Sequence, residues 1–363
     1  MAALPSRRRL VRVFDEARTA HLERLQSGAD GAFIYRLRRY DFDAQLAVDV
    51  GARRLTRLQT AWALATGGYE LVELNEPAAI RNWPSLVLYV TVLRLSSLVR
   101  RRRVRVLYYA IENFDVADFL RVRLHLPLWV ARRVSALAFR WLIPSGTRIA
   151  FGTDQAAALY RAVNARALAR AEVTLIPALS AVCDACDLPD ERLPRVTFLG
   201  AFERRKGLQN LMACWPGVLA AEPDAELAIL GKGPLEAVVA EWARSRTEVT
   251  LRIDPPRGEV HEVLRHTKVL VLLSERDGGW REQVGLPIVE ALSHGCRIVT
   301  TTETGIAPWL LEHGHVVLSQ PDRQSTTAAV RAALADTEPA SSILRQLPAI
   351  DGRLHADTWL TRA

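Results

Sequence analysis

Five consecutive apolar residues, Val269–Leu273, constrain the fold of this chain more than any other stretch. A strand with one face in water alternates apolar and polar side chains, so this unbroken run of valine and leucine predicts a strand buried on both faces. Such strands occur in parallel sheets that carry helices on both sides. The run therefore predicts an α/β fold built around a parallel sheet.

A loop and a helix follow this strand. The chain leaves the sheet at Ser274, and Gly285 precedes Leu286-Pro287, where proline suits a first helical turn because its missing N–H would have no partner there. We expect the helix to run from here to Gly295. A helix that begins at the carboxyl end of a parallel strand directs its first amides and its positive dipole at the crevice above the sheet, where phosphorylated ligands bind.

Two carboxylates flank the start of this helix. Glu282 lies in the loop before it, and Glu290 lies about one turn into it. One can reach hydroxyl groups beside a bound phosphate, and the other can reach hydroxyls beyond it. A solvated helix face offers glutamates at the same spacing, so this pair alone leaves both interpretations open.

Length and charge suggest two different halves. A chain of 363 residues, 49% hydrophobic, is long enough for two globular domains that each bury a core. Residues 1–178 contain 28 arginines against 15 acidic residues, a net charge of +13, and the remainder has 20 basic against 25 acidic residues, or −5, which together give the +8 of the chain. The first half is suited to anions such as an acidic membrane surface, a phosphorylated acceptor or nucleic acid.

The second half contains further strand-to-helix junctions with glycine and cationic residues. A strand ending at Gly200 is followed by Arg204-Arg205-Lys206-Gly207, and another strand leads into Gly231-Lys-Gly233-Pro234. Gly305 follows a third strand, Ile298–Thr301. Only three lysines, at 206, 232 and 268, stand among 45 arginines, so a lysine at this loop indicates a specific role for Lys206.

The order of these motifs, with E-x-x-G-L-x-x-x-E-A at Glu282–Ala291, resembles the retaining GT-B glycosyltransferases of family 4 over residues 196–319. The resemblance implies two Rossmann-like, doubly wound parallel-sheet domains facing a central cleft. It also implies a hexosyltransferase-type enzyme that moves a sugar from a nucleotide-diphosphate-sugar to an acceptor hydroxyl with retention of anomeric configuration.

The resemblance also assigns roles to residues. Glu290 holds the donor ribose, Glu282 contacts hydroxyls of the donor sugar, and Lys206 clamps the diphosphate. The family's clamp arginine is replaced by Ala201, so Arg204 or Arg205 must supply the second cation. These cations and the helix amides stabilise the leaving diphosphate, so we expect no metal ion and no cofactor. The remaining donor-binding residues that the resemblance implies are Gly200, Gly231, Gly233, Gly285, Leu286 and Gly305.

The first half departs from the family pattern. Its first strand, Leu10–Phe14, runs into Asp15-Glu16-Ala17 where the family has a glycine-rich loop. The strand Val104–Ile111 ends at Glu112-Asn113, where many members have a histidine near the reacting sugar. We therefore expect Glu112 to take a catalytic role and Asn113 to lie on the acceptor side. A simple strand-ending turn is the alternative.

Two apolar helices with basic ends are expected in the first half. Trp83–Val99 runs into Arg100–Arg103, and Leu126–Leu142 contains three arginines. Apolar stems with guanidinium heads suit peripheral contact with an anionic membrane, and a buried crossover helix with a basic end is the alternative. Nucleic acid is disfavoured because aromatic residues are not interleaved with the arginines. The apolar stretch is too short to span a bilayer.

The predicted domains are an amino-terminal acceptor-side domain over 1–178, a linker over 179–195, a nucleotide-sugar-binding domain over 196–340 and a helical segment over 341–363 that crosses back to the first domain. Within the first domain we expect one helix over Leu46–Ala65. Four cysteines without a disulfide framework favour a cytoplasmic protein, peripheral at the inner face of the membrane. Cys183-Asp-Ala-Cys186 has the spacing of redox or metal sites, and two linker thiols are the simpler interpretation.

Lipid-linked glycans, polysaccharides and small molecules all remain open as acceptors in glycan biosynthesis. A different class of function is also open, since the missing clamp arginine and histidine would fit a catalytically weak basic module that binds anionic membrane or nucleic acid. A sugar-phosphate synthase on the same scaffold is a third possibility, distinguished by transfer to a soluble phosphosugar.

Overall fold

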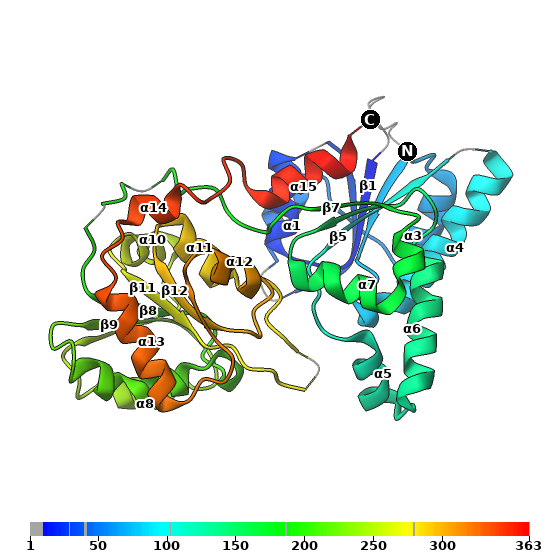
Figure 1. Cartoon of the computed structure of the whole chain (residues 1–363). Coiled ribbons are helices and arrows are strands. Elements are labelled where there is room, and N and C mark those ends of the chain that lie inside the picture. The colour runs from blue at the N-terminus through cyan, green and yellow to red at the C-terminus, as the bar shows by residue number, and fades with distance from the viewer. Residues whose placement is uncertain are drawn as a thin grey trace. The chain divides into compact units, whose positions relative to one another are not determined.

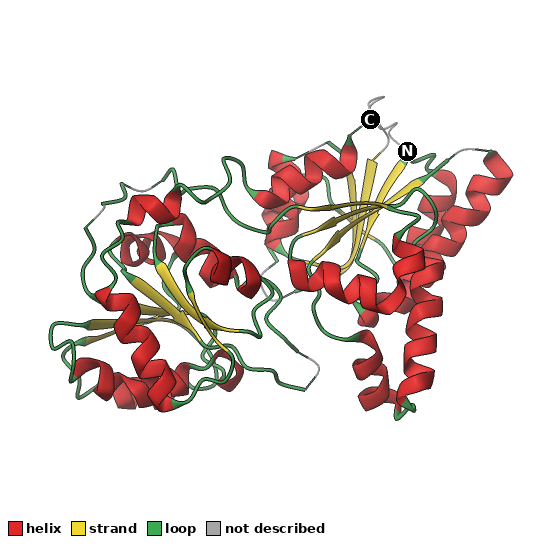
Figure 2. Cartoon of the chain, in the orientation of Figure 1, coloured by secondary structure: helices red, strands yellow, loops and turns green. Residues whose placement is uncertain are grey.

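The computed structural model describes residues 10–28, 30–39, 42–101, 103–185, 187–189, 191–278 and 280–362. The chain divides into two compact units. Unit 1 comprises Met1–Pro177 and Arg353–Ala363, and unit 2 comprises Ala178–Gly352. Each unit is a parallel sheet with helices packed on it (Figure 2).

The described part of unit 1 contains a seven-stranded sheet in the order β3-β2-β1-β4-β5-β6-β7, with every pairing parallel. The strand order reverses between β1 and β4, which gives this sheet a doubly wound topology. The strands are β1 (Leu10–Ala17), β2 (Ala32–Arg38), β3 (Arg53–Arg54), β4 (Leu71–Leu74), β5 (Arg105–Ala110), β6 (Arg148–Phe151) and β7 (Glu172–Leu175).

The helices of unit 1 bury apolar side chains against this sheet, and the largest core cluster includes Val72, Tyr108 and Tyr160. In Figure 1, α5 and α6 lie side by side and extend away from the sheet. The helices are α1 (Thr19–Ser27), α2 (Ala44–Asp49), α3 (Arg57–Thr66), η1 (Ile80–Asn82), α4 (Trp83–Arg100), α5 (Val116–Leu124), α6 (Leu128–Leu142), α7 (Asp154–Leu168) and α15 (Gly352–Thr361).

One prediction for unit 1 is wrong, and one strand is longer than predicted. The single helix expected over Leu46–Ala65 is two helices separated by β3, because Gly51 adopts φ +66° and Thr56 caps a new helix by accepting from the backbone N–H of Gln59. The first strand, predicted over Leu10–Phe14, continues to Ala17, because Glu16 and Ala17 stay in register with β2.

A buried ionic network attaches α15 to the sheet of unit 1. Arg12 on β1 contacts Glu73 on β4 at 3.1 Å and Asp357 on α15 at 2.6 Å. Arg24 on α1 also contacts Glu73. Ala356 and Leu360 pack on Leu10, Leu71, Leu107 and Ala150 beside this network. The carboxyl-terminal helix is therefore part of the first unit's core.

Unit 2 has a six-stranded parallel sheet in the order β10-β9-β8-β11-β12-β13. Its strands are β8 (Arg195–Leu199), β9 (Glu226–Gly231), β10 (Val249–Ile253), β11 (Val269–Leu272), β12 (Arg297–Thr301) and β13 (Val316–Leu318). Its helices are η2 (Arg204–Lys206), α8 (Leu208–Leu219), α9 (Glu236–Ala243), α10 (Arg257–Arg265), α11 (Leu286–Ser293), α12 (Ala307–Glu312), α13 (Arg323–Ala335) and α14 (Ala340–Leu344).

The apolar run at Val269–Leu273 is fully buried in the middle of this sheet, as its sequence predicts. The sheet order reverses between β8 and β11, and in doubly wound folds ligands bind outside the carboxyl ends of the strands at this point. Both units have the Rossmann-like topology that the resemblance predicts. No helix among the described residues combines the length and the hydropathy required to cross a membrane.

Candidate functional site

The loops after β8 and β11 are joined at the point where the sheet order of unit 2 reverses. Gly207 closes the first loop with φ +71°, and a Cβ there would lie 2.2 Å from the carbonyl oxygen of Leu273. The backbone N–H of Glu275 donates to the carbonyl of Arg205 at 2.8 Å. Glycine is required for this close approach, which brings Lys206 to the carboxyl end of β11.

Lys206 and Glu282 form an ion pair at this position. The Lys206 ammonium donates to Oε2 of Glu282, and the Ser274 hydroxyl donates to the same oxygen at 3.0 Å. Both charged side chains are largely buried, with 12% and 11% of their surface exposed. The fold therefore brings together two residues to which the resemblance assigns roles in one donor site.

The two arginines proposed as the second cation differ in their surroundings. Arg205 contacts Glu203 at 2.5 Å, and its guanidinium lies 3.9 Å from the ring centroid of Trp280, which is also 4.9 Å from the Lys206 ammonium. Arg204 is exposed. Arg205 therefore shares an aromatic neighbour with Lys206, and we place the second cation there.

The start of α11 lies directly after Glu282. Gly285 is the N-cap with φ +80°, and Leu286-Pro287 form the first turn, as predicted. The backbone N–H of Gly305 donates to the carbonyl of Glu282 at 2.9 Å. The loop between β12 and α12 is thus attached to the loop that carries Glu282.

Gly200, Gly231 and Gly233 have a packing role in the structure. A Cβ on Gly231 would lie 1.9 Å from the carbonyl oxygen of Gly200, and one on Gly233 would lie 2.9 Å from the backbone of Phe202. These glycines let the turn after β9 pack directly on the loop that leads to Lys206. Their contact with a donor stays a prediction.

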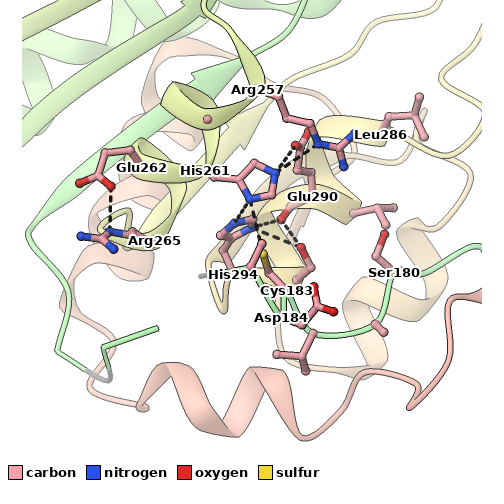
Figure 3. A pocket seen from close by; sticks show the side chains of 16 residues that line it. Ser180, Cys183, Asp184, Arg257, His261, Glu262, Arg265, Leu286, Glu290 and His294 are labelled. Carbon is pink, nitrogen blue, oxygen red and sulfur yellow. Dashed lines mark hydrogen bonds and ion pairs between the residues drawn. The ribbon is translucent and has the colours of Figure 1, made fainter. Parts of the chain in front are cut away.

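Glu290 lies on the wall of a cavity of about 830 Å³ in unit 2. Leu286 lines the same cavity, together with α10 and the segment around Cys183 (Figure 3). The Glu290 carboxylate is 3.9 Å from Nε2 of His261. Among the described residues that line this cavity, neither Lys206 nor Glu282 is present. Glu290 therefore lines a cavity to whose wall the ion pair does not contribute.

The cavity also contains two neighbouring histidines. His261 on α10 faces His294, which follows α11, and the pKa of His294 is lowered by burial and by the nearby charges of His261, Arg192 and Arg257. Cys183 contacts His261 from the segment before β8. Sequence reasoning noted Cys183 but missed both histidines, because they are separated from it along the chain.

In unit 1, Glu112 and Asn113 follow β5, as predicted. The Glu112 carboxylate accepts the backbone N–H groups of Asn113 at 3.2 Å and Phe114 at 3.3 Å, and the Asn113 amide donates to Gln155 at 3.0 Å. Asn113 is buried. These contacts describe a well-ordered strand end, and the expected catalytic and acceptor-side roles stay predictions.

Glu76, which sequence reasoning missed, lies beside this strand end. Its carboxyl accepts the backbone N–H groups of Ile111 and Glu112, both at 3.0 Å, and the hydroxyl of Tyr160 at 3.0 Å. Burial, and then the charge of Glu112, raise its pKa to about 8. A carboxyl at the end of an apolar strand, here β4, was the signal that could have identified it. Ser274 and Trp280 were missed for a similar reason, since each is a single polar or aromatic residue within a loop.

Comparisons with known proteins agree with this geometry. Residues 193–336 match the family model described as glycosyl transferases group 1. A search of curated protein sequences gave no match.

Several solved structures share the fold. WaaG, a glycosyltransferase involved in lipopolysaccharide biosynthesis, is 12% identical with a TM-score of 0.61, covering 98% of this chain and 100% of its own. WaaB, a lipopolysaccharide outer core galactosyltransferase, is 9% identical with a TM-score of 0.65, over 98% and 100%. The α,α-trehalose 6-phosphate synthase of Burkholderia multivorans is 14% identical with a TM-score of 0.63, over 98% of each chain. The chain therefore has the GT-B fold, and its residues 193–336 are similar to the group 1 glycosyltransferases.

Proposed function

We propose that this protein transfers a sugar from a nucleotide-diphosphate-sugar to an acceptor hydroxyl with retention of anomeric configuration. The observation that carries the proposal is the ion pair of Lys206 and Glu282 at the reversal point of the unit 2 sheet. Anionic ligands of doubly wound folds bind at this position, beside the start of a helix. The match of residues 193–336 to the group 1 glycosyltransferases supports the same activity.

The residues at this position suggest how the donor is held. An ammonium has three N–H donors, so Lys206 can contact a diphosphate oxygen while it keeps Glu282 in place. Arg205 adds a second cation, and the helix that begins at Leu286 adds its dipole. Together these groups would stabilise the negative charge that develops on the leaving diphosphate, without requiring a metal ion. The departing phosphate would then take the proton of the acceptor hydroxyl.

Glu290 is proposed to bind the donor ribose. Its carboxylate lines the cavity beside α10, where an anionic oxygen can accept hydrogen bonds from a pair of neutral hydroxyls. The acceptor and the sugar are not specified by these contacts. A sugar-phosphate synthase activity is tested by offering a soluble phosphosugar, since synthases such as that of Burkholderia multivorans share the fold.

The test is a panel of nucleotide-sugars, scored by the thermal stabilisation of the protein and by slow donor hydrolysis. One donor should stabilise the wild type and be hydrolysed, and both effects should be lost in Glu290→Ala and Lys206→Ala. Activity should persist after chelation of divalent ions. Stabilisation by no donor, or stabilisation and hydrolysis in both variants equal to those of wild type, would favour a basic binding module without turnover.

We also propose that the acceptor is met at an anionic membrane surface through the exposed apolar and basic side chains of α6, named here the basic apolar face. Trp129 and Leu137 on α6 expose 68% and 65% of their surface, and arginines lie beside them on the same helix. Apolar side chains flanked by guanidinium groups suit the boundary between lipid headgroups and acyl chains. Two proteins of this fold act in lipopolysaccharide synthesis, which is compatible with a lipid-linked acceptor.

A further inference from the structure

Three side chains with metal-binding atoms meet on the cavity wall of unit 2. Cys183 precedes β8, His261 lies on α10, and His294 follows α11 (Figure 3). Their sulfur and ring nitrogen atoms all lie within 4.8 Å of one another. Sγ of Cys183 is 3.4 Å from Nδ1 of His261, which is 3.3 Å from Nε2 of His294.

The two shortest of these separations, Cys183 to His261 and His261 to His294, agree with tetrahedral coordination. Zinc bound by thiolate and imidazole at its usual bond lengths places two nitrogens about 3.4 Å apart and a nitrogen and a sulfur about 3.6 Å apart. Hydrogen bonds among the three groups would give similar separations. The orientation of the rings and the attachment of the backbone are therefore the more informative features.

The ring of His294 is oriented by a backbone group. Its Nδ1 lies 2.7 Å from the carbonyl oxygen of Glu290, so the N–H of the neutral ring is donated there and the lone pair of Nε2 faces the cluster. Metal-binding histidines usually donate their second ring N–H in this way, because the bond fixes the tautomer and the direction of the lone pair.

The thiol is held in place by the same helix end. The backbone N–H of Cys183 donates to the carbonyl of Ser293 at 2.9 Å, and Arg192 donates to the carbonyl of His294 at 2.5 Å. The segment before β8 is thus attached to the end of α11 at two points. The ligand atoms are brought together by the fold itself, as a binding site requires.

His261 has two neighbours at its outer nitrogen. Arg257 donates to Nε2 at 3.3 Å, which places the ring proton on Nδ1, and the Glu290 carboxylate is 3.9 Å from Nε2. When a cation takes the Nδ1 lone pair, the proton moves to Nε2, and the carboxylate becomes its acceptor in place of the arginine. The result is a carboxylate–histidine–metal arrangement, and the thiol releases its proton to solvent.

We propose that Cys183, His261 and His294 bind a divalent transition-metal ion, with zinc as the preferred ion. One thiolate and two imidazoles form a ligand set that zinc accepts and that magnesium and calcium do not favour. This site is separate from the Lys206–Glu282 ion pair, and its occupancy can be measured without any donor. Its failure would leave the proposed transferase activity untouched.

The test is titration of the chelator-treated full chain with Co²⁺, then displacement by Zn²⁺. Wild type should bind one Co²⁺ with thiolate-to-cobalt charge-transfer absorption and intense tetrahedral visible bands. Cys183→Ala should lose the charge-transfer band. His261→Gln and His294→Gln should each weaken Co²⁺ binding by more than about 100-fold. Loss of a residue that only hydrogen-bonds a metal ligand costs roughly 10–100-fold, and loss of a ligand should cost more. Cys214→Ala and His266→Gln, which remove the same residue types elsewhere in unit 2, should bind as wild type.

A second measurement requires no variant. Zn²⁺ should slow the alkylation of Cys183 in the wild type, followed by mass spectrometry of that residue. A charge-transfer band that survives in a folded Cys183→Ala protein would overturn the proposal. Alkylation of Cys183 at the same rate with and without Zn²⁺ would also overturn it.

Discussion

The Lys206 ammonium donates to the Glu282 carboxylate across two loops that leave adjacent strands, β8 and β11. Both side chains are largely buried, and Ser274 is a second donor to the same oxygen. In the proposed mechanism this pair binds the donor. A cation aimed at a leaving diphosphate acts mainly in the transition state.

Lys206→Met should therefore lower kcat for donor hydrolysis or transfer by about 100- to 1,000-fold, the usual cost of removing one preorganised charge-stabilising group. Steady-state kinetics with the donor identified by the panel measures this. Lys268→Met is the matched control, since Lys268 precedes β11 at the opposite, amino-terminal edge of the sheet. A loss of equal size in the control would show that the effect is structural.

Glu290→Gln should weaken donor binding more than it lowers kcat. The amide keeps the shape of the side chain but loses the charge that strengthens hydrogen bonds to ribose hydroxyls, a difference of about 1–1.5 kcal/mol per bond, or roughly 5- to 13-fold in Kd. Isothermal titration with the donor provides the measurement. Glu262→Gln is the control, because Glu262 lines the same cavity but pairs with Arg265 at 3.1 Å. Unchanged affinity in Glu290→Gln would remove the ribose role.

The basic apolar face predicts membrane binding that depends on lipid charge. Wild type should float with vesicles that contain phosphatidylglycerol and much less with pure phosphatidylcholine, and added salt should weaken the binding. Trp129→Ser with Leu137→Ser should reduce binding to anionic vesicles, because both side chains are exposed on α6. The control is Trp62→Ser, an exposed tryptophan on α3. Equal binding by the double variant and wild type would contradict the assignment of this face.

Features of the fold and site that depend on residues close together in the sequence were predicted, and those that depend on contacts between distant segments were not. The run Val269–Leu273 predicted a buried parallel strand because every residue in it is apolar, so both faces of the strand avoid water. The resemblance placed Glu282 and Lys206 in one donor site, and they meet because both follow parallel strands, which end at one edge of a sheet.

The features that were not predicted depend on contacts between distant segments. Cys183 and His261 are separated by 78 residues, and no local spacing indicates that they meet. The helix expected over Leu46–Ala65 failed because its apolar pattern continues across Gly51, and only the pairing of β3 with β2 reveals the break. The Arg12 network was missed because a charged residue inside an apolar strand has no local signature of its buried partners.

Asp357→Ala should destabilise unit 1 strongly. It leaves the fully buried Arg12 guanidinium with one fewer carboxylate, and breaking a buried ion pair from one side costs about 3–5 kcal/mol. The melting temperature of the full chain should fall by roughly 6–20 °C. Asp357→Asn should be milder, because the amide oxygen still accepts a hydrogen bond. Glu70→Ala, an exposed acidic residue before β4, is the control and should change little. A shift below 2 °C for Asp357→Ala would show that Glu73 alone compensates the arginine.

Glu76 should make the stability of unit 1 depend on pH. Its folded pKa of about 8 lies above the ordinary value of 4.5 because burial and Glu112 favour the neutral carboxyl. The stability from this group is therefore complete below about pH 4.5 and is lost as pH rises through about 8, with a slope near 1.4 kcal/mol per pH unit between them. Glu76→Gln preserves an acceptor oxygen for the backbone N–H groups of Ile111 and Glu112 and is neutral at every pH.

The difference in melting temperature between Glu76→Gln and wild type should thus shift in favour of the variant from pH 5 to pH 8 and stay constant above that. Thermal unfolding of both proteins at several pH values measures the difference directly. Glu70→Gln, at an exposed position of the same unit, should give a difference that does not vary over this range. A difference for Glu76→Gln that is flat between pH 5 and 8 would mean that the buried carboxyl is already ionised at pH 5, with Ile111, Glu112 and Tyr160 supplying enough hydrogen bonds to hold its charge.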